Sequence, residues 1–207
     1  MNIFRRQKRT WRMRGWAIWI ILVSVGMGLA WAAEMPQVAF PDSPFPIRQI
    51  DEGRDGAALQ RIEILRHVLP VKYSRRHNFA WAVAKIEGLE KVEYFAHSGV
   101  DRKGEVSSVA IRGIENISLR PKHGRFEVLC VNREDEIEGA DCFPRYSDTE
   151  YKILEDLASR LPDSAVSGRV RLYTDLPPCA SCRHVMQQFL EAYPRIQLQV
   201  LYRGRTN

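Results

Sequence analysis

Residues 168–202 read GRVRLYTDLPPCASCRHVMQQFLEAYPRIQLQVLY, and this stretch decides the fold class. Val170 and Leu172 alternate with polar neighbours, as in a strand, and Pro177-Pro178 ends it. A helix is expected from Cys179 to about Tyr193, with an inward-facing apolar side of Val185, Met186, Phe189 and Leu190. A last strand alternates through Ile196, Leu198, Val200 and Tyr202. Two strands separated by a helix at this spacing predict parallel pairing, with the helix packed on the sheet.

The preceding residues extend this pattern towards the N-terminus. A helix that ends at Pro162 carries one apolar stripe of Ile153, Leu154, Leu157, Ala158 and Leu161. The segment 78–86 is apolar on both faces, as in a central strand, and 92–97 returns from it after Gly88 as a hairpin. A further helix begins near Ala57 and stops at Pro70. These elements predict an α/β fold, with an antiparallel N-terminal hairpin and parallel C-terminal strands in one mixed sheet.

The rest of the chain divides into three parts. Residues 33–56 contain closely spaced Pro and Gly and are predicted to be a linker. Residues 57–207 form the expected folded domain, and within it 99–146 is an irregular insertion with a strand or two. Residues 1–32 have a basic start and an apolar run from Trp16 to Trp31. This leader is either a cleaved signal peptide or a membrane anchor through residues 16–32, and both place the domain outside the cytosol, periplasmic, secreted or anchored in the inner membrane.

The formal charge of +6 comes from this leader. Six basic residues precede residue 16, whereas the first acidic residue is Glu34. Without the leader, 25 basic residues balance 25 acidic ones. The composition therefore gives no independent indication of nucleic-acid binding, which normally needs a basic groove.

The four cysteines form two differently spaced pairs. Cys130 and Cys142 lie 12 residues apart in the loop-rich insertion, where they form a disulfide or remain two unrelated buried thiols. Cys179 and Cys182 lie one helical turn apart at a helix N-terminus, which stabilises thiolates. This second pair has three interpretations: structural core thiols, a thioredoxin-type redox pair, or two ligands of a metal that needs a third.

Asp148 and Glu150 begin the preceding helix. Ser147 and Glu150 match the S-x-x-E capping box, in which both side chains bond to backbone N–H groups of the first turn. A different role follows from position, because the N-termini of consecutive helices lie at the same edge of a parallel sheet. Asp148 would then converge with the two thiols as a third metal ligand, with Glu150 beside them as a proton carrier.

These motifs resemble the zinc-dependent cytidine deaminase superfamily from residue 77 to 203, whose pattern is H-x-E followed by P-C-x-x-C. Asp148-Thr149-Glu150-Tyr151-Lys152-Ile153-Leu154, with Pro177-Pro178-Cys179-Ala180-Ser181-Cys182 and Gln188-Phe189, is similar to the deaminase family at the C-terminal tips of bacterial polymorphic toxins. Asn78 before an alanine-rich strand and Ala96-His97-Ser98-Gly99 after the hairpin also resemble that family. Asp148 departs from the His or Cys that is more frequent at its position.

The resemblance implies a cytidine-deaminase-like three-layer α/β/α sandwich and a hydrolytic deamination. Zn²⁺ would be held by Asp148, Cys179 and Cys182, with Glu150 as the catalytic proton carrier. The substrate-binding residues would be Asn78 and Pro178. The expected substrate is a nucleobase, cytosine in preference, in nucleic acid or nucleoside, and a toxin-type effector implies an immunity protein as partner. An exported thiol-disulfide oxidoreductase and a non-catalytic, envelope-anchored zinc protein are the alternatives.

Overall fold

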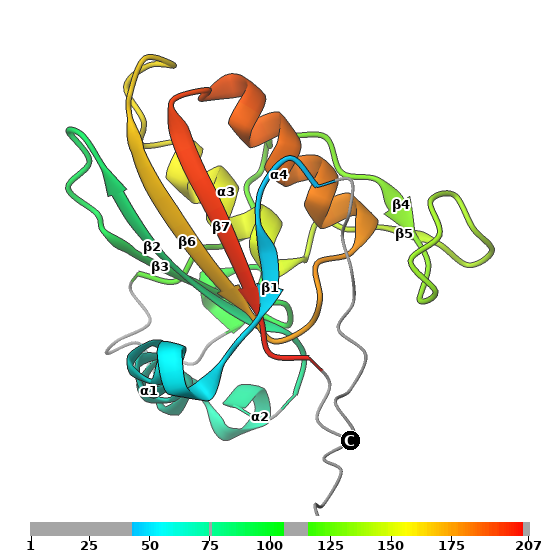
Figure 1. Cartoon of the computed structure of the whole chain (residues 1–207). Helices are drawn as coiled ribbons and strands as arrows, with labels where there is room; N and C mark the ends of the chain where they lie inside the picture. The colour runs from blue at the N-terminus through cyan, green and yellow to red at the C-terminus, as the bar shows by residue number, and fades with distance from the viewer. Residues whose placement is uncertain (1–42, 75, 106–115, 205–207) are drawn as a thin grey trace, which may run out of the picture. The chain divides into compact units, whose positions relative to one another are not determined.

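One mixed five-stranded sheet organises the domain, in the order β1-β7-β6-β2-β3 (Figure 1). The structure, a computed structural model, describes residues 43–74, 76–105 and 116–204. The elements in chain order are β1 (Ile47–Gln49), α1 (Glu52–His67), α2 (Val71–Ser74), β2 (Phe79–Ile86), β3 (Glu93–His97), the 3-10 helix η1 (Lys103–Glu105), β4 (Cys130–Val131), β5 (Phe143–Pro144), α3 (Thr149–Ala158), β6 (Gly168–Thr174), α4 (Ala180–Ala192) and β7 (Ile196–Tyr202). Four strands and three long helices lie where the sequence predicts them.

The strand directions confirm the predicted mixed sheet. β2 and β3 pair as an antiparallel hairpin, while β6 and β7 pair in parallel across α4. The two halves meet where β2 runs antiparallel to β6, from Ala80 opposite Thr174 to Ile86 opposite Gly168. This register brings the start of β2 beside the end of β6, and these two strand ends form the edge that carries the chemistry described below.

The sheet has helices on both faces, which makes the three-layer arrangement. On one face, α3 and α4 bury Leu154, Leu157, Val185 and Phe189 against the strands. On the other face, α1 packs a smaller cluster against the lower part of the sheet, made of Ala58, Ile62, Leu65, Phe79, Trp81, Phe95, Tyr173 and Leu201. The α/β fold with flanking helices agrees with a cytidine-deaminase-like architecture.

Small residues set how closely the layers approach. β2 turns Ala80, Ala82 and Ala84 towards α3 and α4, all fully buried. Because alanine projects one methyl group, the helix backbone can lie close to the strand. Gly168 does the same between strands, since a Cβ there would lie 2.3 Å from the carbonyl oxygen of Lys85.

The N-terminal boundary differs from the sequence prediction. Residues 33–56 were expected to lack regular structure, yet β1 pairs in parallel with β7 and α1 already begins at Glu52. Asp51 caps that helix, since its side chain accepts a hydrogen bond from the backbone N–H of Arg54 at 2.9 Å. Arg48 of β1 makes two bonds to the buried Asp55 of α1, at 2.7 and 2.9 Å. The domain therefore starts before Ala57.

The insertion 99–146 contains η1, the short β4–β5 ladder and long irregular stretches. A disulfide joins Cys130 to Cys142 across it. Residues 106–115 and the predicted leader 1–32 lie outside the described residues. Among the residues that are described, no helix is both long and apolar enough to cross a membrane.

Candidate metal centre

The N-termini of α3 and α4 meet at the carboxyl end of β6. Both helices run opposite in direction to β6 and β7, so that Asp148 and Cys179, the residues at their N-cap positions, come together at one edge of the sheet. Asp148, Cys179 and Cys182 each offer one ligand atom, and these three atoms lie within 4.8 Å of one another. The convergence predicted from the order of the elements is therefore present.

Asp148 occupies the N-cap position of α3 but makes no capping bond. Its Oδ2 atom instead lies 3.2 Å from Sγ of Cys179 and 3.2 Å from Sγ of Cys182. Ser147, the N-cap of the predicted capping box, donates its hydroxyl to Asp101 at 2.7 Å. The capping box predicted for Ser147 and Glu150 is therefore wrong, since Asp148 is the N-cap residue and the Glu150 carboxylate bonds to Thr149 and Thr174 instead. The Asp148 carboxylate faces the two thiols.

The donor set and its spacing fit a zinc ion. The two Sγ atoms are 3.4 Å apart, which closes a triangle with the two 3.2 Å contacts to Asp148. In a tetrahedral site with Zn–S near 2.3 Å and Zn–O of 2.0–2.2 Å, ligand atoms lie about 3.6–3.8 Å apart. An outward shift of a few tenths of an ångström would suffice. Three protein ligands of this kind leave one coordination position for water or substrate, as in catalytic zinc sites.

The two thiols lie in different surroundings at the α4 N-terminus. Cys179 is the N-cap residue, and its Sγ atom accepts the backbone N–H of Cys182 at 3.5 Å. Both cysteines are free, unlike the pair in the insertion. The hydrogen bond with Cys179 and then burial raise the pKa of the Cys182 thiol well above its ordinary value. Metal binding would therefore displace a proton from Cys182.

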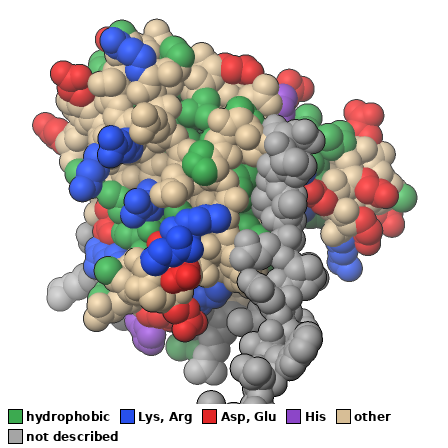
Figure 2. Space-filling model, viewed as in Figure 1, with side chains coloured by type: hydrophobic (Ala, Val, Ile, Leu, Met, Phe, Trp, Pro, Cys, Tyr) green, Lys and Arg blue, Asp and Glu red, His purple; other side chains and the backbone are tan. Residues whose placement is uncertain are grey.

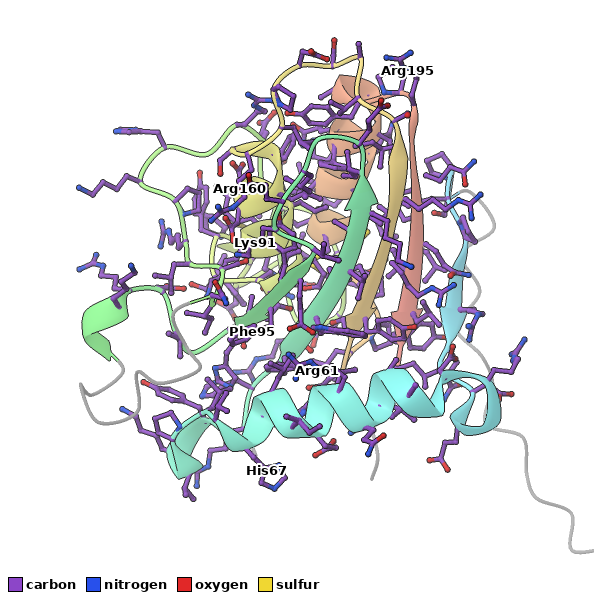
Figure 3. All side chains as sticks on the ribbon, turned by 90° about the vertical axis from the view of Figure 1, so that its left-hand side faces the viewer. Arg61, His67, Lys91, Phe95, Arg160 and Arg195 are labelled. Carbon is purple, nitrogen blue, oxygen red and sulfur yellow. A yellow bond between two sulfur atoms is a disulfide. The ribbon has the colours of Figure 1, made fainter. Side chains whose placement is uncertain are left out.

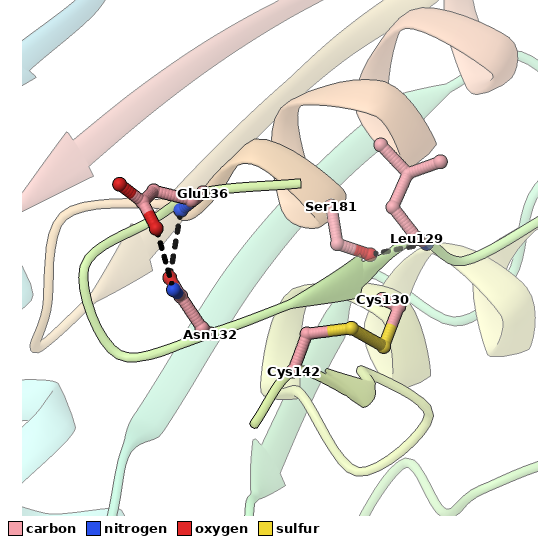
Figure 4. Close-up of a disulfide and its surroundings, with 6 residues drawn as sticks. All are labelled: Leu129, Cys130, Asn132, Glu136, Cys142 and Ser181. Carbon is pink, nitrogen blue, oxygen red and sulfur yellow. Dashed lines mark hydrogen bonds between the residues drawn. A yellow bond between two sulfur atoms is a disulfide. The ribbon is translucent and has the colours of Figure 1, made fainter. Parts of the chain in front are cut away.

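Residues 127–142, of which 130–142 are closed by the disulfide, contact the two residues between the thiols (Figure 4); we call this segment the stapled lobe. Leu129 donates its backbone N–H to the buried Ser181 hydroxyl at 3.0 Å. Asp135 accepts the backbone N–H of Ala180 at 2.6 Å and pairs with Arg183 at 3.1 Å. The stapled lobe therefore holds the turn that carries the two thiols.

Glu150 lies beside the triad with its carboxylate buried at 2 % exposure. Thr149 donates its hydroxyl to one carboxylate oxygen at 2.6 Å, and Thr174 donates to the other at 2.8 Å. Burial raises the pKa of Glu150, and the neighbouring Asp148 charge raises it further, against the opposing effect of the two hydroxyls. A raised pKa brings a carboxyl group closer to the range in which it can both accept and return a proton.

The two predicted substrate contacts occupy different environments. Asn78 is half-buried, and its amide nitrogen lies 2.8 Å from Thr149 Oγ1, 3.0 Å from Thr174 Oγ1 and 3.5 Å from Glu150 Oε2. Pro178 is buried, and its carbonyl oxygen accepts a bond from Arg183 at 2.7 Å. A substrate contact by either residue stays a prediction.

The structure adds residues that the sequence did not suggest. The alternation of residues in a strand does not mark Thr174 as a functional residue. Only the strand register, which places it beside Glu150, identifies it. Lys152 is fully buried, and its ammonium group donates to the carbonyl oxygens of His97 and Val100 at 3.0 Å and pairs with Asp101 at 2.6 Å. Since Asp101 also accepts from Ser147, this contact fixes the start of α3 to the loop after β3.

The fold and the site together define a cytidine-deaminase-like protein, with an acidic residue and a C-x-x-C pair at two helix N-termini and a buried glutamate between them. A family model for toxin deaminases, described as the BURPS668_1122 family of deaminases, matches residues 62–204, more than two thirds of the chain. The chain belongs to this family, a cytidine-deaminase-like domain of polymorphic toxins. No curated protein and no solved structure matches it.

Proposed function

We propose that this protein is a zinc-dependent hydrolytic deaminase of a nucleobase, with cytosine preferred, in a nucleic acid or a nucleoside. Membership of the deaminase family supports the reaction class. The position of the Asp148 side chain is the observation that supports the metal assignment. Asp148 stands at a helix N-cap, where a carboxylate would normally accept backbone N–H groups, and it faces two free thiols instead.

Each residue of the site has a separate role in the proposed reaction. When bound by Asp148, Cys179 and Cys182, Zn²⁺ supplies a Lewis acid that lowers the pKa of water towards neutrality. Glu150 would accept one proton from the attacking water and deliver it to the ring nitrogen of the base; it would then accept the second proton, from the new hydroxyl group on the ring carbon, and deliver it to the departing amine. Water and the amino-bearing base thus become ammonia and a carbonyl-bearing base. Thr149 and Thr174 hold the two carboxylate oxygens in place during these transfers.

The redox alternative has less support. A thioredoxin-type pair needs an exposed first cysteine that ionises readily to a thiolate. A neighbouring carboxylate opposes this ionisation. Here one carboxylate oxygen contacts both sulfurs, and the Glu150 carboxyl is buried nearby. That arrangement places three ligand atoms around one point, as a metal site requires.

The setting of the reaction is part of the proposal. Residues 1–32 would export the chain or anchor it in the inner membrane, so a nucleobase substrate is met in another cell or as a free nucleoside. Action on a neighbouring cell is consistent with the toxin family. Such an effector requires an immunity protein in the producing cell.

The test uses the full chain loaded with zinc, together with its Glu150→Gln variant. Single-stranded DNA, RNA and free nucleosides are incubated with each protein, released ammonia is measured, and the product bases are read by mass spectrometry. We expect C-to-U conversion with the native chain and none with Glu150→Gln, while both bind zinc equally. Deamination by the Gln variant, or stoichiometric zinc in Cys179→Ala, would contradict the assignment.

A further inference from the structure

A groove of about 920 Å³ lies away from the metal centre, on the sheet face that α1 only partly covers. Its walls come from β2, β6, β7, the start of α1 and the segment before β1. Figure 3 shows why it is open: α1 crosses the lower ends of the strands, and their upper parts extend beyond the helix. The groove thus exposes a part of the sheet that has no helix layer.

Three cations project into this groove from neighbouring strands. Lys85 of β2 pairs in register with Arg169 of β6, and Arg171 follows Arg169 on the same face. Gln197 and Gln199 of β7 extend the two rows, opposite Arg169 and Arg171. Figure 2 shows Lys and Arg side chains in a row on this side of the molecule. The result is a row of positive charges and hydrogen-bond donors along the groove.

These cations have no acidic partner within the described part of the chain. Lys85, Arg169 and Arg171 are exposed, and none belongs to an ion pair there, whereas Arg48, Arg61, Arg66 and Arg203 each do. Arg171 donates only to neutral groups, including Gln199 at 2.9 Å. The positive charge of the groove is therefore available to an external anion.

One cluster of acidic residues lies away from the groove. Five lie close together in the stapled lobe: Glu134, Asp135, Glu136, Glu138 and Asp141. After the leader, basic and acidic residues are equal in number, but they are unevenly distributed. The stapled lobe carries a cluster of negative charges, and the groove carries unpaired positive charges. Fields of this kind concentrate oppositely charged ligands at the surface that carries the unpaired charges.

We propose that this groove binds the phosphate backbone of a single-stranded nucleic acid, as a second contact for a polymeric substrate. Protein–nucleic acid interfaces are more polar and much more positive than protein–protein interfaces, whose cores are depleted of charge. The exposed strand residues that line the groove are Lys85, Arg169, Arg171 and Gln197, and Trp81 and Tyr173 lie buried beneath them. Asp55 also lines the groove, but it is buried and paired with Arg48. The chemistry therefore fits phosphates better than an acidic protein surface.

One strand connects the groove with the metal centre. β6 carries Arg169 and Arg171 in the groove and ends at Thr174, which bonds to Glu150. Five residues separate Arg169 from Thr174, a distance of about 17 Å along a strand. Arg169 and Arg171 face α1, whereas Thr174 faces α3 on the other side of the sheet. A polymer that contacts both sites must therefore pass around the sheet, and it needs more than the about five nucleotides that 3.4 Å per stacked nucleotide gives for this length. The inference rests on the proposed function in one respect, namely that the target base belongs to such a polymer.

The experiment measures binding rather than turnover, so it can be read even if no deamination is found. Fluorescence anisotropy follows the full chain, in mild detergent, binding labelled DNA and RNA strands of about 20 nucleotides over a series of salt concentrations. The test variant combines Lys85→Gln, Arg169→Gln and Arg171→Gln. The control removes three exposed charges elsewhere, with Lys72→Gln, Lys103→Gln and Lys122→Gln. The six leader cations are common to all three proteins.

Each lost phosphate contact lowers the slope of log K against log salt by about 0.7, so we expect the groove variant to lose about 2 and the control much less. Substrate KM should also rise for long strands and stay unchanged for a trinucleotide, with kcat preserved. Equal slopes for the two triple variants would overturn the proposal. So would equally effective displacement of the oligonucleotide by polyglutamate of matched charge, which would assign the groove to an acidic protein.

Discussion

Asp135 tests whether the stapled lobe supports the metal centre. The variant Asp135→Asn keeps the shape of the side chain and removes its charge. The native carboxylate accepts the Ala180 N–H at 2.6 Å and pairs with Arg183 at 3.1 Å, directly after Cys179, a proposed zinc ligand. Hydrogen bonds to charged groups contribute about 1.5–3 kcal/mol when well shielded. The Asp135 side chain is 41 % exposed, so solvent screening favours the low end, about 1–2 kcal/mol.

That free energy corresponds to zinc binding weakened about 5- to 30-fold, since about 1.4 kcal/mol is a factor of ten. Competition between the apoprotein and a chromophoric chelator measures the zinc Kd directly and needs no substrate. Glu134→Gln, the preceding residue in the same lobe, is the matched control. Equal zinc affinities for the two variants, with both proteins folded, would refute the idea that the lobe holds the ligand turn.

Three further predictions concern stability, measured by urea unfolding. Replacing Cys130 and Cys142 by Ser opens a loop of 12 residues and should cost about 3 kcal/mol; an unchanged midpoint would show that the lobe folds without its disulfide. Gly168→Ala should destabilise by at least about 1–3 kcal/mol because its Cβ meets backbone, whereas Gly56→Ala in open space on α1 should stabilise by up to about 1 kcal/mol. The arginine bonded to Asp55 lowers the pKa of that carboxyl, so its contribution is present above about pH 4 and is lost as pH falls through the folded-state pKa. Asp55→Asn should therefore be less stable than the native chain near pH 7, and the difference should shrink below about pH 4; a constant difference would contradict this.

The long elements were predictable because each carries its own pattern. The β2 segment is apolar on both faces, and the helices α3 and α4 carry apolar stripes that end at proline. The sequence did not predict β1, because a segment of three residues is too short to show an alternating hydrophobic pattern. Only its pairing with β7 defines it as a strand. Tertiary contacts therefore decide the elements that are too short to specify themselves.

The convergence of Asp148 with the two thiols was predictable from the order of elements and not from local preference. Locally, Ser147 and Glu150 favour a capping box, and only their position beside the C-x-x-C helix suggested another use. The residues that hold Glu150 and the thiols came from elsewhere in the chain. Thr174 depends on strand register, and Asp135 depends on the path of an irregular lobe. Neither has a sequence pattern, because their partners are distant or are backbone groups.

The alanine face of β2 has a consequence for how the protein can vary. Ala80, Ala82 and Ala84 are in contact with the layer that contains α3, the helix whose first turn carries Glu150. A larger side chain there would move that helix away from Thr174 and the thiols, in addition to straining the core. Substitutions on this face should thus lower activity before they unfold the chain. The buried residues that pack against α1 on the opposite face lack that link to Glu150, so they should vary more freely among related sequences.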